Sequence, residues 1–170
     1  MKKMLFVCVL ILGCSITFSC KNNQSNEINN YELFFVRHAE KADDGTKDPP
    51  LTSEGEKRAS NLAEILKDKG ITKIYSTDYK RTRFTGKPLA DLLNLEIELY
   101  NPSDKEFAAK LKNELESGSA LIVGHSNTTP TLVNAVLGEK KYDQLSEDDY
   151  ENLFSIHKKG DQLEAEVVKY

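Results

Sequence analysis

Residues 31–40 read YELFFVRHAE, and within this stretch a short apolar run stops at an arginine and a histidine. An apolar run of this length favours a buried strand. Two later stretches repeat the arrangement: KIYST at 73–77 is followed by Arg81, and LIVGH occupies 121–125. In an open α/β sheet, ligands bind beyond the carboxyl ends of the strands. We therefore expect one edge of the sheet to gather two arginines and two histidines, namely Arg37, His38, Arg81 and His125.

Helical patterns lie between these predicted strands. Apolar residues recur at i, i+3, i+4 and i+7 over 59–66, which is the stripe of an amphipathic helix. Ser53 and Glu56 have the spacing of a capping box at its start, and Gly70 closes it. Three more helices are predicted: 78–93 with Pro88 inside, 103–115 with a capping box of Ser103 and Glu106, and one that begins at Thr129 with Pro130 in a favourable first position.

The remaining strands complete the prediction of the fold. They cover 71–75, 95–100, 120–123, 152–157 and 162–168. Strands that alternate with helices predict an α/β fold, a three-layer sandwich whose largely parallel central sheet is flanked by helices. The last two strands are joined across KKGD at 158–161, so we expect them as an antiparallel addition at one edge. Residues 31–170 are long enough for one domain with its own core.

The N-terminus has the pattern of an export signal. Residues 1–19 begin with MKKM and continue as a nearly unbroken apolar run, which predicts a signal peptide. The run ends at Cys20, and the polar stretch KNNQSNE follows at once. This resembles a bacterial lipoprotein signal, with acylated Cys20 as the mature start and 20–30 as a flexible tether. The resemblance implies export and lipid anchoring in a bacterial cell-envelope membrane. Cys14 is a competing site, and an ordinary signal or an uncleaved anchor is the plainer alternative.

Composition narrows the possible functions of the body. The formal net charge is −4 and no basic run stands out, so nothing indicates nucleic-acid binding. All three cysteines lie within the first twenty residues, which excludes a thiolate metal site or a cysteine nucleophile from the rest of the chain. No feature indicates an obligate protein partner. An acidic protein that binds an anion must concentrate its positive charge locally, so each well-placed arginine is informative.

The four residues expected at the sheet edge suit phosphate chemistry. A neutral imidazole is nucleophilic near pH 7 and can carry a phosphoryl group. An arginine guanidinium matches the oxygens of phosphate with two parallel hydrogen bonds. A second histidine, when protonated, donates to the oxygens on which charge develops. The helix after His125 can also direct its N-terminus at the same anion. Taken singly, an Arg-His pair or a Gly-His turn is weak evidence, and Arg81 could lie on a solvated basic face.

Four motifs in the same order resemble the histidine phosphatase superfamily, in its phosphoglycerate mutase-like branch. They are RHAE at 37–40, LTSEG at 51–55, YSTD at 75–78 with Arg81 beyond, and VGHSN at 123–127, so the resemblance covers 31–137. It implies that His38 is the phosphorylated nucleophile. It also implies that Arg37, Arg81 and His125 hold the phosphate of a small phosphorylated substrate, and that no metal or organic cofactor is needed.

The proton donor and the substrate remain open at this point. Asp104 and Glu40 are the candidate donors, yet Asp104 also fits the first turn of a helix, and small phosphohistidine phosphatases manage without a dedicated acid. We expect hydrolysis of a phosphomonoester or a phosphoramidate. The alternatives are a phosphoryl-transferring mutase and a non-catalytic anion-binding lipoprotein. The loops at 41–50 and 101–104 and the region 138–150 are expected to set specificity.

Overall fold

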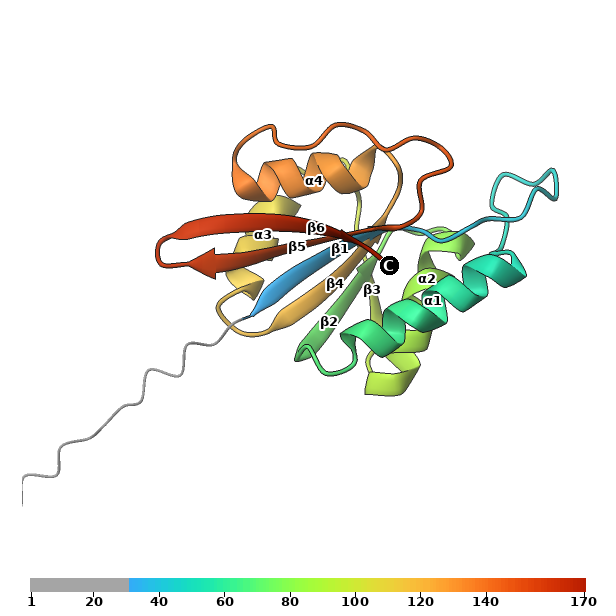
Figure 1. The fold of residues 1–170 in the computed structure, drawn as a ribbon, viewed down its shortest axis with the longest axis horizontal. Coiled ribbons are helices and arrows are strands. Elements are labelled where there is room, and N and C mark those ends of the chain that lie inside the picture. Colours follow the sequence, from blue (N-terminus) through green and yellow to red (C-terminus); the bar gives the residue numbers. More distant parts are fainter. Residues whose placement is uncertain (1–30) are drawn as a thin grey trace, which may run out of the picture.

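The alternation of strands and helices predicted from the sequence is present in the computed structural model, which describes residues 31–170 (Figure 1). Six strands form one mixed sheet in the order β3-β2-β4-β1-β5-β6. Their bounds are β1 Glu32–Arg37, β2 Ile71–Ser76, β3 Ile97–Leu99, β4 Ser119–Gly124, β5 Asn152–Lys159 and β6 Gln162–Lys169. The helices of the described residues are α1 Ser53–Leu66, α2 Lys80–Leu93, α3 Phe107–Glu114 and α4 Thr128–Leu137.

Strand direction follows the prediction. β3, β2, β4 and β1 pair in parallel, whereas β5 pairs antiparallel with β1 and β6 antiparallel with β5. The predicted α/β fold with a largely parallel sheet and an antiparallel pair at one edge is therefore confirmed.

The predicted signal peptide, the tether and the acylation site Cys20 lie outside the described residues. Between residues 31 and 170, no helix has the length and apolar character needed to cross a membrane.

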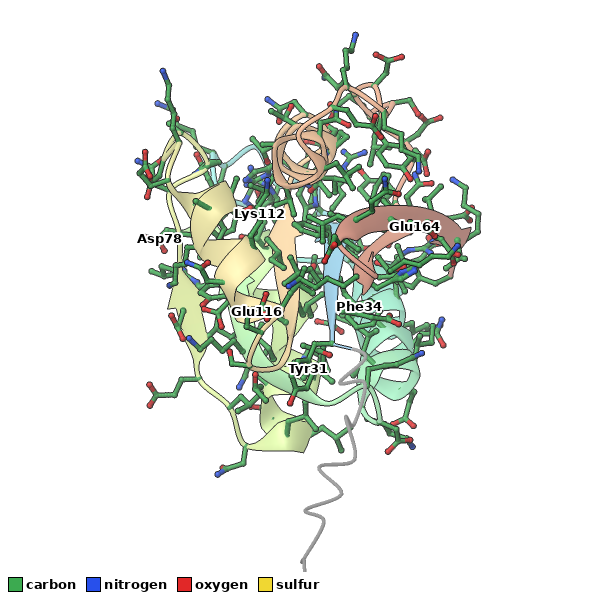
Figure 2. All side chains as sticks on the ribbon, turned by 90° about the vertical axis from the view of Figure 1, so that its left-hand side faces the viewer. Tyr31, Phe34, Asp78, Lys112, Glu116 and Glu164 are labelled. Carbon is green, nitrogen blue, oxygen red and sulfur yellow. The ribbon has the colours of Figure 1, made fainter. Side chains whose placement is uncertain are left out.

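The central strands are apolar on both faces because each face is covered by helices. Leu33 and Phe35 of β1 pack with residues of α3 and α4, while Phe34 and Val36 pack with residues of α1 and α2. All four side chains are at most 3% exposed. Figure 2 shows side chains filling the space on both faces of the sheet, with Phe34 well inside the molecule and Asp78 near its outside. This burial on two faces fixes the strand ends that form the site.

Details at the helix starts differ from the prediction. α1 begins at Ser53 as predicted but has another cap, and α2 begins at Lys80 rather than at residue 78. The cap of α1 is Thr52 rather than Ser53, because the Thr52 hydroxyl accepts a hydrogen bond from the Gly55 backbone N–H at 3.1 Å. α3 begins at Phe107 rather than after Ser103. There, the Asp104 carboxylate accepts from the Glu106 N–H at 2.9 Å, a turn that competes with helix formation. α4 begins at Thr128, so Pro130 occupies its third position.

Candidate active site

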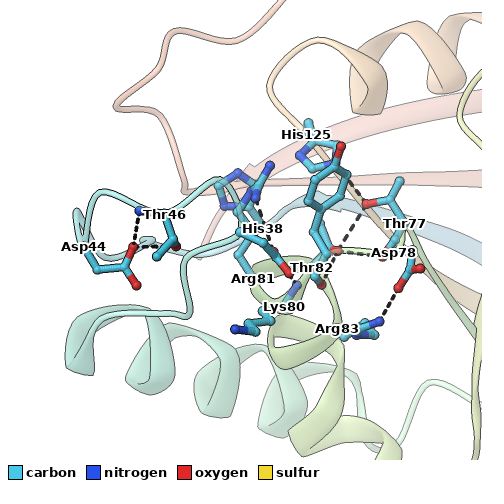
Figure 3. Close-up of polar contacts among 12 residues, drawn as sticks. His38, Asp44, Thr46, Thr77, Asp78, Lys80, Arg81, Thr82, Arg83 and His125 are labelled. Atoms are coloured by element: carbon cyan, nitrogen blue, oxygen red, sulfur yellow. Dashed lines mark hydrogen bonds and ion pairs between the residues drawn. The ribbon is translucent and has the colours of Figure 1, made fainter.

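Three strands end at the same edge and deliver the predicted residues to one pocket. His38 follows β1, Thr77 follows β2 and His125 follows β4. Backbone hydrogen bonds join these ends: the His38 N–H donates to the Gly124 carbonyl at 3.0 Å, and the Thr77 N–H to the Val123 carbonyl at 3.3 Å. The pocket has a volume of about 380 Å³. Arg37, His38, Arg81 and His125 all line it, and Figure 3 shows His38, Arg81 and His125 gathered together.

The imidazole of His38 is held in the form that a nucleophile needs. Its Nδ1 lies 2.8 Å from the Ala39 carbonyl oxygen. Because a carbonyl oxygen only accepts, Nδ1 carries the hydrogen in this contact and Nε2 keeps its lone pair. Burial lowers the pKa of His38 to about 3, and the nearby charges of Arg37, His125 and Arg81 act in the same direction against the opposing Ala39 contact. His38 is therefore uncharged near pH 7.

His125 stands edge-on to His38 across the pocket. The two ring centroids are 5.5 Å apart and the rings are inclined by 71°. Thr77 Oγ1 lies 3.0 Å from Nε2 of His125 and is itself hydrogen bonded to the Thr82 hydroxyl, which fixes the ring (Figure 3). Burial, followed by the charges of Arg81 and Arg37, lowers the pKa of His125 to about 4. The pocket thus brings two neutral imidazoles next to two cations.

The guanidinium of Arg37 is anchored by the segment that precedes β5. Its Nη1 donates to the carbonyl oxygens of Ser146 at 2.7 Å and Asp149 at 3.3 Å, and its Nη2 donates to the Glu147 carboxylate at 3.2 Å. The Tyr150 ring covers the guanidinium, with its centroid 4.2 Å from Cζ. The side chain is only 1% exposed, so its charge cannot swing into solvent. These contacts fix the two terminal nitrogens of the guanidinium, and Nε takes no part in them.

Arg81 is positioned from the first turn of α2. Its Cζ lies 4.3 Å from the centre of the Tyr79 ring, and Nη1 is 3.7 Å from the Asp48 carboxylate, beyond hydrogen-bond distance. Among the described residues, Arg81 Nε and Nη1 and Arg37 Nε are buried donors without a hydrogen-bond partner. Unsatisfied buried donors cost about 1–3 kcal/mol each, more when charged. An anion with several acceptor oxygens, such as a phosphoryl group, matches this set of donors.

Gly124 keeps the end of β4 narrow enough for this arrangement. A Cβ atom there would lie 2.8 Å from Thr129 Oγ1 and 3.0 Å from the Tyr100 hydroxyl. The neighbouring Thr128 hydroxyl accepts from the His125 backbone N–H at 3.0 Å. A side chain at position 124 would therefore disturb the contacts that place His125. A glycine is therefore needed at position 124 for a steric reason, which the spacing of the motif alone did not predict.

The two proton donors suggested by the sequence are not among the residues that line this pocket. The Glu40 carboxylate accepts from Arg58 Nε at 2.8 and 3.0 Å. Partial burial acts to raise the pKa of Glu40, but the Arg58 contacts prevail and hold it below its ordinary value. Asp104 lies by an adjacent cavity of about 330 Å³ between α3 and α4. The structure thus brings together four of the six predicted residues.

Replacing Glu40 by glutamine is expected to lower the free energy of unfolding by about 1–3 kcal/mol, because the half-buried Arg58 guanidinium loses its counter-ion. A carboxyl group whose pKa is lowered by folding stabilises the fold at pH values above its ordinary pKa of 4.5. This stabilisation is lost as the pH falls through the lowered pKa. The deficit should therefore be full at pH 7 and fade in acid. Urea titrations at several pH values measure it, with exposed Glu96→Gln as the control. Loss of turnover without loss of stability would instead make Glu40 a catalytic group.

Several residues of the pocket were not identified from the sequence. They are Lys41, Tyr79, Asn127 and Glu147. Tyr150, for which the sequence allowed either a pocket position or simple packing, has its ring tilted toward that of His38, with 6.0 Å between the centroids. The sequence indicates the region 138–150 only as a specificity region, because its pattern has no regular period. Within residues 31–170, no group of three or more His, Cys, Asp or Glu side chains is arranged to hold a metal ion.

Comparisons with known proteins find relatives for part of the chain. The family model described as "Histidine phosphatase superfamily (branch 1)" matches residues 33–101. The "Probable phosphoglycerate mutase GpmB" of Escherichia fergusonii is 38% identical over 81 residues, which are 44% of this chain and 37% of that protein. The protein of the same name from Yersinia enterocolitica is 36% identical over 72 residues, which are 39% of this chain and 34% of that protein. The matched part of the chain thus spans little more than a third of the curated relatives.

Two solved structures share the fold. The protein histidine phosphatase SixA, complexed with tungstate, superimposes with a TM-score of 0.59 at 23% identity, over 74% of this chain and 86% of that one. The phosphoglycerate mutase from Bacillus anthracis str. Sterne gives 0.58 at 17% identity, over 81% and 92%. Residues 33–101 are thus similar to the histidine phosphatase superfamily, the curated relatives of this part of the chain are phosphoglycerate mutase-like proteins, and the fold of the chain is that of the two solved structures.

Proposed function

We propose that this protein is a phosphatase that hydrolyses a phosphomonoester or a phosphoramidate through a phosphohistidine on His38. The observation that carries the proposal is the set of buried, unpaired guanidinium donors of Arg37 and Arg81 beside an uncharged histidine. The donors suit a phosphoryl group, and the histidine supplies the lone pair that attacks it. In this proposal Arg37, Arg81 and His125 hold the phosphoryl oxygens.

The reaction has two displacements. First, Nε2 of His38 attacks phosphorus, so a P–N bond forms while the bond to the leaving group breaks and that group takes up a proton. Water then attacks phosphorus, the P–N bond breaks, and phosphate leaves with His38 neutral again. In both steps the arginines stabilise the charge on the equatorial oxygens, as in other phosphoryl transfers.

The charges of the pocket favour a proton on His125 once the substrate is bound. Without a bound anion, burial and then the charges of Arg81 and Arg37 oppose protonation of His125. A dianionic phosphoryl group bound between them offsets those charges and favours the imidazolium. His125, which is half-buried, then becomes a donor to phosphate. His38 is fully buried, and this burial keeps it neutral, with its hydrogen on Nδ1 toward the Ala39 carbonyl and its lone pair on Nε2.

The direct test is release of inorganic phosphate from para-nitrophenyl phosphate by the full chain. Steady turnover supports a phosphatase. Transfer of the phosphoryl group to an added alcohol or sugar phosphate, with little free phosphate, would favour a mutase, the activity named for the curated homologues. Binding of inorganic phosphate without turnover of any phosphorylated compound would favour the anion-binding lipoprotein.

For residues outside the described range, the proposal includes export and acylation of Cys20, supported by the apolar run and the polar stretch after it. Mass spectrometry of the protein from membranes should find lipidated Cys20 at the N-terminus and no residues 1–19. Several acyl chains are expected, since a single chain anchors only marginally. Cys20→Ser should abolish the modification and Cys14→Ser should not. Acyl groups on Cys14 would move the site, and an unmodified protein would remove the anchor from the proposal.

A further inference from the structure

Glu147 is the one carboxylate among the described residues that line the pocket of His38. It belongs to the segment between α4 and β5, and one of its oxygens accepts from Arg37 Nη2 at 3.2 Å. The other oxygen accepts from the Ser126 hydroxyl at 2.8 Å, next to His125. The carboxylate is thus held at two points, by the last residue of β1 and by a residue just after β4. Its side chain is 77% exposed, so it remains open to solvent and to a substrate.

This position brings Glu147 into contact with whatever binds to Arg37. A phosphoryl group held by Arg37 and Arg81 would lie beside the Glu147 carboxylate, because one guanidinium would then contact both. Two anions at such a distance do not both keep their charge easily, and the carboxylate takes up a proton or moves away. A protonated carboxyl group beside the phosphoryl group is what an oxygen leaving group needs, since an alkoxide departs poorly without a proton.

The other carboxylates suggested for this role are committed elsewhere. Glu40 is paired with Arg58, and the Asp104 carboxylate accepts the Glu106 backbone N–H beside the adjacent cavity. We propose that Glu147 is the acid–base residue of the pocket and that it allows the enzyme to use phosphate esters of poorly leaving alcohols. This inference rests on the phosphatase function proposed above and adds the residue that selects the leaving group.

The proton is accounted for in both steps. In the first step the Glu147 carboxylic acid gives its proton to the leaving oxygen as the P–O bond breaks and the bond from His38 Nε2 to phosphorus forms. In the second step the resulting carboxylate takes a proton from the attacking water while the P–N bond breaks. When phosphate leaves, Glu147 gives up the proton that it took up on substrate binding, and neutral His38 and the Glu147 carboxylate are restored. The alcohol and phosphate are the only products, and no further reagent is consumed.

The test compares two leaving groups in the full chain and in Glu147→Gln. Glutamine keeps the size of the side chain and can still contact Arg37 and Ser126, but it cannot transfer a proton. For glycerol phosphate, whose alkoxide leaves poorly, kcat/KM should fall by about 10²-fold, a typical contribution of general acid catalysis. For para-nitrophenyl phosphate, whose phenolate leaves without help, the change should stay below about threefold. The exposed neighbour Asp148→Asn removes a charge at the next position and should leave both rates unchanged.

Each other outcome counts against the inference in a recognisable way. Equal losses with both substrates would give Glu147 a positioning role on Arg37 only. A gain in kcat/KM for both would mean that the carboxylate blocks Arg37 and has to be displaced. If the unaltered chain hydrolyses para-nitrophenyl phosphate but not glycerol phosphate, the phosphatase function is supported and the acid–base role of Glu147 is contradicted. Absence of turnover with every phosphorylated compound would overturn the phosphatase itself.

Discussion

Replacing His38 by alanine is expected to reduce kcat for para-nitrophenyl phosphate by about 10⁴-fold or more, because the covalent route loses its nucleophile. The unaltered protein, mixed briefly with radiolabelled substrate and quenched, should carry phosphate that is labile in acid and stable in alkali, as expected for a phosphoramidate. His38→Ala should carry none. The fold should tolerate alanine at position 38, because one side of the histidine side chain borders the pocket and leaves little packing to lose.

The chain offers a matched control for this experiment. His157 lies on β5 and lines a different cavity, where its Nε2 is 4.0 Å from the Glu164 carboxylate. His157→Ala should keep kcat within about twofold and still trap phosphate. Full turnover in His38→Ala, or trapped phosphate that survives the substitution, would require another nucleophile and would contradict the mechanism.

The fold could be predicted from the sequence because its central strands carry two independent signals. Residues such as Phe34 and Phe35 are both apolar although they point to opposite faces, which is typical of a strand covered by helices on both sides. The strand ends then carried Arg37-His38 and Gly124-His125, so the general geometry of parallel sheets was enough to predict that these residues meet. The structure brings them together as expected, while their catalytic roles stay predictions.

The remaining features depend on contacts that no local pattern contains. Glu147 and Tyr150 come from a long segment without helix or strand, and they reach Arg37 across more than 100 residues of sequence. Nothing in their spacing distinguishes them from solvated residues. The cap of α1 was predicted wrongly for a different reason. Serine and threonine are both favoured caps, and only the hydrogen bond from the Gly55 N–H to the Thr52 hydroxyl decides between Ser53 and Thr52.

Arg81→Lys is expected to lower kcat/KM by about 10³-fold, the upper range for loss of preorganised donors to a developing charge. The reason is geometric. Arg81 presents two buried donors, Nε and Nη1, while its guanidinium plane rests on the Tyr79 ring. A lysine ammonium is a point charge on a flexible stem, so it keeps the net charge but cannot reproduce the planar fork. The substitution therefore separates the shape of the donor from its charge.

Arg83→Lys is the matched control, because Arg83 lies two residues further along α2, is 40% exposed and pairs with Asp78 (Figure 3). Its kcat/KM should change by less than about twofold. The affinity of each protein for inorganic phosphate, measured as product inhibition, should follow the same order, since a lost fork weakens the bound anion as well as the transition state. If Arg83→Lys has a large effect and Arg81→Lys is nearly normal, Arg83 and not Arg81 binds the phosphate. The buried Arg81 donors without a hydrogen-bond partner would then have no part in the reaction.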